Sequence, residues 1–437
     1  MRRRWLAGIF AVSAIWAIAV AVVSNDNVHQ TWGQMAAVGY GLAFAAVLLL
    51  RHSRTADIAL GLAFLGGLVV PLGYLAARGL WQPEVWVVAR SGMTLIHHGT
   101  PYANPAALAR TQQPNDYNPY LPVMALFGLP RAFFDLGLLT DPRVWFGLVF
   151  LGVFWLSLRQ GGARDPGRWT VLVAATPVIA FELAVGGTDV PMVAFLCLGF
   201  AYLWPALAGR PALTEREGAL RIRWRKPAGE AAAAVLGCRP VLAGLALGIG
   251  ASMKATAWPA LLVAAALLWA TEGRRAVRNF ALTALGVMVV CVGPFVFVHP
   301  KALVVNTIEF PLGLASVQSA ARSPLPGYLI ASTWGHTGHT VVVVLLGLAG
   351  LAIALSLVLR PPRTVPRAVA LLAGAMTLMF VLAPSTRVGY FIYPAALAIW
   401  VLAVRSGRQA DEELLGEIDV SFLPADVPET PPVPRSR

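Results

Sequence analysis

Charge and cysteine are both scarce in this sequence. Only 13% of the 437 residues are charged, against about 25% in an average soluble protein, while 57% are hydrophobic and the mean hydropathy is +0.68. A soluble domain of this length would need more charge to cover its surface, and a disordered chain would be far less hydrophobic. Three cysteines are too few for a disulfide scaffold. The composition therefore predicts an all-α, polytopic integral membrane protein.

The sequence also lacks the short motifs of several common membrane enzymes and pumps. It contains no Walker-type phosphate loop, no GxSxG nucleophile elbow, no HExxH pair and no CxxC pair. These absences argue against a nucleotide-hydrolysing transporter and against a membrane metalloprotease. The histidines at 97, 98, 336 and 339 have no cluster of carboxylates near them in the sequence, so we expect no metal and no other cofactor.

Mostly apolar runs recur along the whole chain, many of them near the roughly 20 residues that cross a bilayer. The runs predict about 12 transmembrane helices, at 5–23, 32–50, 57–79, 143–158, 169–185, 190–207, 241–253, 255–270, 280–297, 340–359, 367–383 and 389–404. The predicted organisation has two extra N-terminal spans in 1–56, a transmembrane core in 57–405 and a cytoplasmic tail in 406–437. The tail begins acidic and ends rich in proline, which predicts disorder.

The distribution of positive charge predicts the orientation. The chain carries 34 Lys and Arg against 21 Asp and Glu, a net charge of +13. With a cytoplasmic N-terminus, 25 of the 34 fall in the cytoplasmic segments 1–4, 51–56, 159–168, 208–240, 271–279, 360–367 and 405–437. Lys and Arg collect in cytoplasmic loops, so the excess needs no nucleic-acid partner. We expect a multi-pass plasma-membrane protein whose two termini are cytoplasmic.

Two long non-cytoplasmic loops follow from this topology, at about 80–142 and 298–339. Residues 118–134 are apolar but interrupted by three prolines, so we interpret them as a short re-entrant or interfacial segment. The run 241–270 has Lys254 near its middle and predicts two short helices that meet there. The loop 298–339 should be irregular with short helices, and the basic loop 208–240 should be solvated.

Five charged residues outside the cytoplasmic segments are candidates for function, because charge in or beside a bilayer is costly. They are Glu84, Asp116, Asp189, Lys254 and Arg387, and the predicted topology places all of them on one face of the membrane. A carboxylate can act as a general base toward a hydroxyl, and Arg and Lys side chains bind phosphate. Together these residue types suggest transfer from a phosphate-activated donor to an alcohol.

Short motifs follow one another in a characteristic order over residues 80–405. The first outer loop contains Glu84-Val85-Trp86, His98-Gly99-Thr100-Pro101-Tyr102 and Tyr117-Asn118-Pro119-Tyr120-Leu121-Pro122. Later come Gly186-Gly187-Thr188-Asp189, then Gly244-Leu245-Ala246-Leu247-Gly248 followed by Lys254, and Pro384-Ser385-Thr386-Arg387 with Tyr390 and Tyr393. In order and spacing these motifs resemble those of the GT-C glycosyltransferases of family 87, polytopic enzymes that are abundant in actinobacteria.

The resemblance implies a GT-C-like enzyme in a bacterial plasma membrane. Such an enzyme moves a hexose, in the first place mannose, from a polyprenyl-phosphate donor to a lipid or glycan acceptor on the outer face, with inversion at the anomeric carbon. Glu84 would be the catalytic base, and Arg387 and Lys254 would stabilise the leaving phosphate. The other substrate-binding residues would be Asp116, Tyr117, Asp189 and Tyr390.

Two other functions fit the same composition. A transporter or flippase of a lipid-linked or polar solute would have similar helices, but its polar residues should lie near the bilayer midplane. The family usually has Asp where Glu84 stands, which leaves open an inactive accessory subunit of envelope glycan assembly. The candidates also have structural interpretations, since Glu84 and Asp189 are favourable at helix N-termini and Lys254 can reach the membrane interface.

Overall fold

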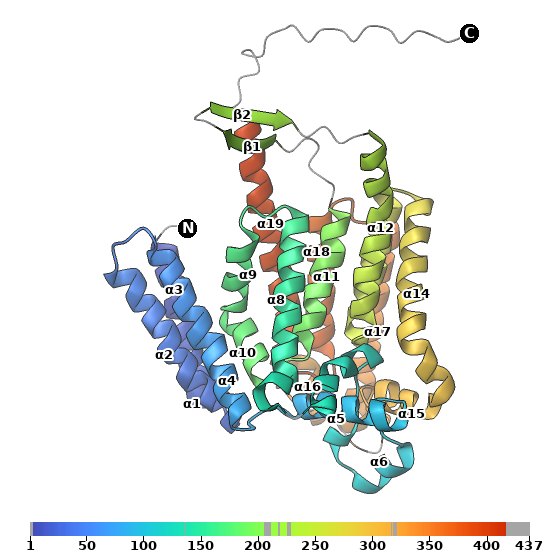
Figure 1. Cartoon of the computed structure of the whole chain (residues 1–437). Coiled ribbons are helices and arrows are strands. Elements are labelled where there is room, and N and C mark those ends of the chain that lie inside the picture. Colours follow the sequence, from blue (N-terminus) through green and yellow to red (C-terminus); the bar gives the residue numbers. More distant parts are fainter. Residues whose placement is uncertain are drawn as a thin grey trace, which may run out of the picture.

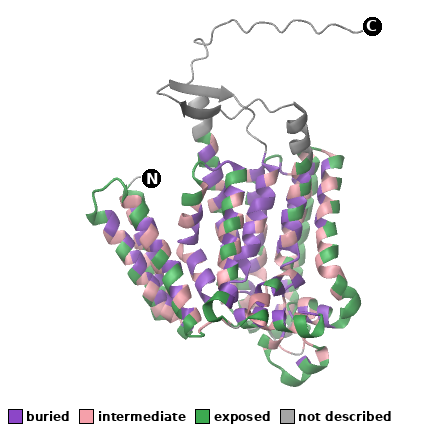
Figure 2. Cartoon of the chain, viewed as in Figure 1, coloured by how far each residue is buried: buried purple, intermediate pink, exposed green. Residues whose placement is uncertain are grey.

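The computed structural model describes residues 3–134, 136–204, 211–216, 219–224, 229–315, 317 and 321–416. These residues form an almost entirely helical bundle, in which the long helices run side by side (Figure 1). Buried residues concentrate in the interior helices, and the outer helices expose one side (Figure 2).

The N-terminal helices form a group of their own at one side of the bundle (Figure 1). They are α1 (Arg3–Val23), α2 (Asn27–Leu49), α3 (Thr55–Phe64), the π-helical turn η1 (Leu65–Val69) and α4 (Val70–Ala77). Two buried side chains of α2 hold the group together and attach it to the rest. Trp32 donates a hydrogen bond to the Gly67 carbonyl at 3.0 Å, and the Tyr40 hydroxyl donates to the Ala175 carbonyl at 2.8 Å.

The segment after α4 lies across one end of the bundle, here called the α5 end (Figure 1). It consists of α5 (Pro83–His98), α6 (Pro105–Thr111), η2 (Pro114–Asp116), η3 (Pro122–Gly128), α7 (Leu129–Phe133) and η4 (Gly137–Thr140). Residues 118–134 thus form only short helical turns, as the prolines predict.

The remaining elements build the main bundle. They are α8 (Pro142–Gly161), α9 (Pro166–Ala174), α10 (Pro177–Val185), α11 (Asp189–Leu203), β1 (Pro211–Arg216), β2 (Ala219–Trp224), α12 (Gly229–Ala251), η5 (Ala255–Ala257), α13 (Trp258–Thr271), α14 (Arg274–Val298), α15 (Pro300–Val304), η6 (Val305–Glu309), α16 (Pro326–Thr333), α17 (Gly335–Leu359), α18 (Val365–Leu382), η7 (Val388–Phe391) and α19 (Ile392–Gly416). The helices α12 and α13 meet beside Lys254, and the loop after α14 is irregular with short helices, both as predicted.

Eight of the described helices are long and apolar enough to cross a membrane, or nine if the bent pair α9 and α10 counts as one span. Three shorter apolar helices, at Asp189–Leu203, Cys238–Ala251 and Ala255–Thr271, match the other predicted runs. Each of the twelve predicted runs therefore lies on helix. The protein is a multi-pass membrane protein of the all-α class.

The loop 208–240 contains the antiparallel pair β1–β2, whose second strand alternates apolar and charged residues. Two details of the prediction are wrong. The run 169–185 is a broken helix, with α9 and α10 bent by 68°, because Pro177 lacks an N–H and keeps Thr176 extended. Helix α19 continues to Gly416 through good helix formers, past the predicted tail boundary at 406. Residues 417–437 lie outside the described residues.

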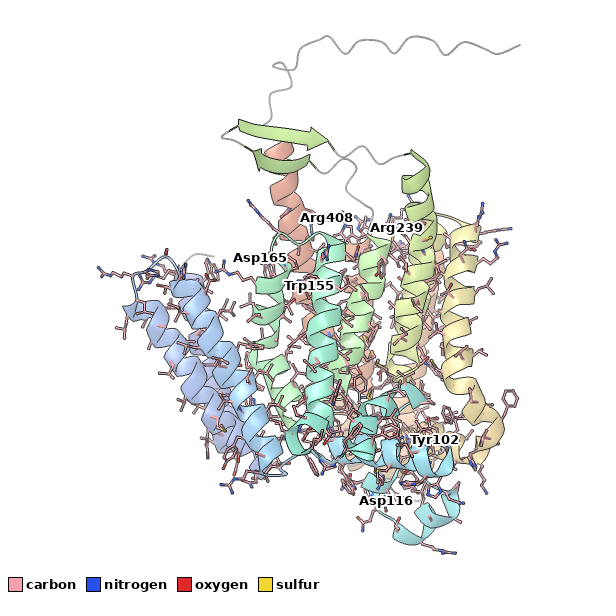
Figure 3. The ribbon with its side chains drawn as sticks, in the orientation of Figure 1. Tyr102, Asp116, Trp155, Asp165, Arg239 and Arg408 are labelled. Atoms are coloured by element: carbon pink, nitrogen blue, oxygen red, sulfur yellow. The ribbon has the colours of Figure 1, made fainter. Side chains whose placement is uncertain are left out.

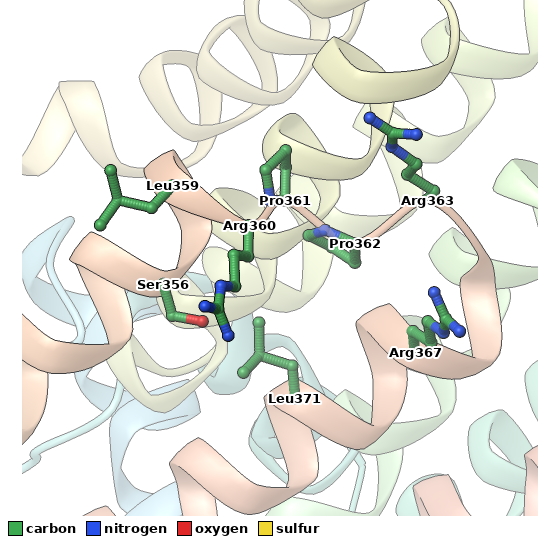
Figure 4. Close-up of a pocket in the computed structure, with 8 residues that line it drawn as sticks. All are labelled: Ser356, Leu359, Arg360, Pro361, Pro362, Arg363, Arg367 and Leu371. Atoms are coloured by element: carbon green, nitrogen blue, oxygen red, sulfur yellow. The ribbon is translucent and has the colours of Figure 1, made fainter.

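The two ends of the bundle differ in character. Tyr102 and Asp116 lie at the α5 end, whereas Asp165, Arg239 and Arg408 lie at the opposite end (Figure 3). A cavity of about 520 Å³ between the end of α17 and the start of α18 also belongs to that opposite end. Three exposed arginines line this cavity, Arg360, Arg363 and Arg367 (Figure 4).

Helix α5 packs on η3 through two glycines. A Cβ added to Gly92 would lie 2.4 Å from the Gly128 carbonyl carbon, and one added to Gly128 would lie 2.1 Å from the Val88 carbonyl oxygen. Only hydrogen atoms fit between the two backbones. This contact sets the position of α5 and of the residues in its first turn.

The variant Gly92→Ala should push α5 away from η3. We expect it to lower the free energy of unfolding by about 1–3 kcal/mol, the usual cost of overpacking. Gly61→Ala in α3 is the matched control, because a Cβ there meets nothing within 4 Å; it should be neutral or slightly stabilising. Thermal unfolding of the purified protein in detergent measures both, and equal midpoints for the two variants would contradict the packing argument.

Candidate active site

A cavity of about 1120 Å³ lies at the α5 end of the bundle. Segments from many parts of the chain line it, from α1 near the N-terminus to the turn between α18 and α19. Six of the predicted site residues line it: Glu84, Tyr117, Asp189, Lys254, Arg387 and Tyr390. The polar residues at the ends of the predicted spans therefore lie together at one cavity.

Glu84 and Arg387, which both line this cavity, form an ion pair. Glu84 lies in the first turn of α5, where a negative charge is favourable, and Arg387 lies just before η7. The Arg387 guanidinium contacts the Glu84 Oε1 atom. The other carboxylate oxygen, Oε2, is buried and has no hydrogen-bond partner among the described residues. One acceptor of this carboxylate is therefore unsatisfied in the described structure.

Arg387 is positively charged in this site. Burial alone would lower the pKa of its guanidinium, but the nearby Glu84 carboxylate and Tyr390 raise it, and the net pKa lies above its usual value. A guanidinium in this position stays positively charged at every accessible pH. It is suited to hold an anion.

Asp189 and Lys254 form a second, more deeply buried ion pair. Lys254 Nζ lies 2.5 Å from Asp189 Oδ1, and the two side chains are 11% and 10% exposed. The Tyr393 hydroxyl donates to the same Oδ1 atom and lies 2.9 Å from Thr256 Oγ1. Lys254 also lies over the Tyr120 ring, 4.8 Å from its centroid. The pair thus joins α11, the α12–α13 turn and α19.

The turn before Asp189 needs its glycines. Gly186 has φ of +133°, a conformation that side chains rarely adopt, and a Cβ there would lie 2.2 Å from a methyl carbon of Val85. A Cβ on Gly187 would lie 2.5 Å from Glu182 Oε2. The glycines thus let the turn approach α5, and Asp189 follows at the start of α11.

A buried arginine fixes the two backbone segments that carry the acidic residues. Arg143 is fully buried and pairs with Asp141 at 2.8 Å. Its Nη1 donates to the Leu80 carbonyl at 2.8 Å and to the Ala184 carbonyl at 2.9 Å. Arg143 therefore holds the entry to α5 against the end of α10.

Two cavity residues escaped the sequence analysis. Glu182 in the middle of α10 is 8% exposed, and no described residue donates a hydrogen bond or forms an ion pair with its carboxyl group. Arg322 is exposed and has no ion-pair partner among the described residues. A short parallel bridge to Thr386 brings Arg322 beside the segment of Arg387. No signal in the sequence points to Glu182. It lines the cavity in the bent arrangement of α9 and α10, and the sequence analysis did not predict that bend.

Asp116 differs from the other candidates. It is absent from the residues that line the cavity, and it forms an ion pair with Arg90 of α5 at 2.8 Å. Arg90 also donates to the backbone carbonyls of Asn115 and Asp116. The neighbouring Tyr117 is buried and stacks on Phe310 at 4.5 Å. In this structure Asp116 holds η2 on α5.

The two N-terminal helices α1 and α2 also line the cavity. Residues of α1, of the α1–α2 turn and His29 of α2 line it. Gln82 Nε2 donates to His29 Nε2 at 2.5 Å, which joins α2 to the residue before α5. The predicted boundary at 56/57 therefore separates helices that share one cavity.

Comparisons with known proteins add a structural likeness. No known protein family matches the chain, and no curated protein matches it. Two solved structures are similar to it, those of ArnT from Cupriavidus metallidurans in the apo state and bound to undecaprenyl phosphate. The apo structure has a TM-score of 0.44 and 18% identity over 87% of this chain. The bound structure has a TM-score of 0.44 and 16% identity over 84% of this chain. In both cases the match spans 63% of the ArnT chain.

The Asp189–Lys254 pair allows a stability test. Lys254→Met alone leaves a buried carboxylate without its cation, which should cost about 3–5 kcal/mol of unfolding free energy. The double variant Asp189→Leu/Lys254→Met removes both charges and should recover most of that loss. Thermal unfolding in detergent measures each variant. A double variant no more stable than Lys254→Met would show that the two charges are not coupled.

Proposed function

We propose that this protein is an integral membrane glycosyltransferase of the GT-C type that uses a polyprenyl-phosphate sugar as donor. The observation that carries the proposal is the Glu84 carboxylate, which has one unpaired oxygen and lines a cavity together with Arg387 and Arg322. A carboxylate with a free acceptor can take a proton from a hydroxyl. Arginines beside it can hold a phosphate in a planar, bidentate geometry.

In the proposed reaction Glu84 accepts the proton of the acceptor hydroxyl. The acceptor oxygen attacks the anomeric carbon of the donor sugar, and a new glycosidic bond forms as the bond from that carbon to the phosphate oxygen breaks. The polyprenyl phosphate leaves with both electrons of that bond. Arg387 and Arg322 stabilise its charge, and Lys254, which lines the same cavity, adds a third positive charge.

The ion pair of Glu84 with Arg387 gives the reaction an order. A donor phosphate that binds Arg387 competes with the Glu84 carboxylate for the same guanidinium. Binding of the donor therefore weakens the hold of Arg387 on Glu84 and makes both oxygens of the base available. The base is released when the donor is in place, which disfavours proton transfer in an empty site.

The remaining parts of the proposal concern the substrates and the setting. The sugar is a hexose, with mannose the first to test, and the acceptor is a lipid or glycan. In this proposal the lipid-linked sugar is the donor co-substrate, and the reaction uses no metal and no other cofactor. The α5 end faces outward from a bacterial plasma membrane, because the arginine-rich opposite end suits the cytoplasm. The termini are then cytoplasmic.

Transport is the second candidate for this cavity. A solute pathway should bring its polar groups to the bilayer midplane at the interface of repeated units. Glu84, Asp189, Lys254 and Arg387 instead lie at the ends of helices or in the turns between them. Their position at one end of the bundle supports the transferase over a transporter.

Glu84→Gln should abolish sugar transfer while it preserves the shape of the site. General-base catalysis contributes roughly 10²–10⁴-fold in rate, so we expect a loss of about that size. The assay follows radiolabel from polyprenyl-phosphate mannose into a native lipid extract with the purified protein in detergent. The matched control is Asp116→Asn, which changes a carboxylate outside the cavity lining and should retain transfer.

The outcomes of this assay separate the alternatives. Loss of transfer in Asp116→Asn but not in Glu84→Gln would move the base to Asp116. Absence of product with the wild-type protein would call for a polyprenyl-phosphate pentose as the next donor. A second absence of product would favour transport or an inactive accessory subunit.

A single displacement makes a stereochemical prediction. Attack on the anomeric carbon from the side opposite the phosphate should give a product with the anomeric configuration inverted relative to the donor. The one-bond coupling constant between the anomeric carbon and its proton in the NMR spectrum of the purified product reports this configuration. Retention would exclude this inverting single displacement.

A further inference from the structure

Helix α1 has three distinct faces. One face packs into the bundle and consists of Leu6, Phe10, Ser13 and Ala17. A second face is exposed to the surroundings, with Val12 and Ile15 both 66% exposed and Val22 76% exposed. The third face lines the cavity of Glu84 and consists of Trp16, Ala19, Val20 and Val23. These four positions follow the i, i+3, i+4, i+7 spacing of one side of a helix.

Two apolar residues of α10, Val178 and Phe181, line the same part of the cavity. The Phe181 ring contacts the Trp16 ring of α1 edge to face, with 5.7 Å between the ring centroids. We call this part of the cavity the α1 arm and define it by six residues: Trp16, Ala19, Val20, Val23, Val178 and Phe181. The arm contains no charged side chain, whereas Glu84, Arg387 and Arg322 line the same cavity beyond it.

We infer that the α1 arm binds the first isoprene units of a polyprenyl phosphate whose phosphate group lies at Arg387 and Arg322. The identity of the lipid rests on the proposed function. A polyprenyl phosphate is an anion joined directly to a hydrocarbon chain, and the cavity offers positive charge and an apolar passage in one continuous space. The chain gains free energy by leaving water for apolar surroundings, and the exposed side of α1 lets the rest of the chain continue into the bilayer.

The sugar has its own place in this arrangement. A hexose needs several hydrogen-bond partners, and among the side chains of the α1 arm only the Trp16 indole N–H is polar. Glu182, Asp189 and Lys254 supply such partners elsewhere in the cavity. The sugar and the lipid of the donor thus bind to different parts of the cavity, and α1 supplies residues for the lipid part. The N-terminal helices then contribute to the choice of donor lipid.

The test compares two substitutions two residues apart on α1. Val20→Trp fills the α1 arm, and Val22→Trp places the same side chain on the exposed face, outside the cavity lining. Native mass spectrometry measures the dissociation constants of undecaprenyl phosphate and of dimethylallyl phosphate, which has a single isoprene unit. In the wild-type protein the long chain should bind more tightly. Val20→Trp should reduce this advantage by about tenfold or more, and Val22→Trp should preserve it.

A second measurement covers a failure of Val20→Trp to fold. An undecaprenyl phosphate analogue with a photoreactive group near the phosphate end should cross-link to the peptide 3–23 in the wild-type protein, with competition by unlabelled lipid.

An unchanged advantage of the long chain in Val20→Trp, an equal loss in Val22→Trp, or cross-links confined to other helices would overturn the inference. Because these readouts measure binding, they are independent of sugar transfer. Lipid binding in the arm without transfer would contradict the proposed function alone, and transfer with normal chain selectivity in Val20→Trp would contradict the α1 arm alone.

Discussion

The ion pair between Glu84 and Arg387 connects the beginning of the outer segment to the turn between the last two helices. The Glu84 and Arg387 side chains are 19% and 32% exposed, so the pairing stabilises two partly buried charges that would each be costly alone. The pair therefore fixes where α5 and the α18–α19 turn meet. The second pair, Asp189 with Lys254, joins the interior helices to each other in the same way. Arg143 anchors the backbone that carries both acidic residues.

Much of this architecture follows from the sequence. Helical spans can be predicted because a bilayer demands long apolar segments with all backbone groups paired. The same logic found Glu84, Lys254 and Arg387, since a charge at the end of a span has few reasons to exist other than function or anchoring. The break at Lys254 was visible as a single charge within an otherwise continuous apolar run. The hydrophobicity of the sequence therefore predicts the positions of the helices and of their ends.

Other features depend on tertiary contacts that hydrophobicity does not encode. Glu182 lines the cavity only because α10 bends away from α9, and the size of that bend depends on packing. Arg322 reaches the site through a backbone bridge to Thr386, between segments far apart in the chain. Asp116 has a sequence context like that of the other candidates, yet it pairs with Arg90 outside the cavity lining. Whether a polar side chain faces a cavity or a neighbouring side chain is decided by geometry in three dimensions.

The order in which the cavity walls are synthesised has a consequence for assembly in the membrane. The cavity takes one wall from α1 and another from the turn before α19, which is synthesised long after α1. Until that turn is inserted, Glu84 lacks its cation and the cavity lacks Arg387. A chain whose synthesis stops early would thus display an unpaired buried carboxylate and an open apolar face on α1. Insertion of that turn therefore completes the Glu84 ion pair and the lining of the cavity in one step.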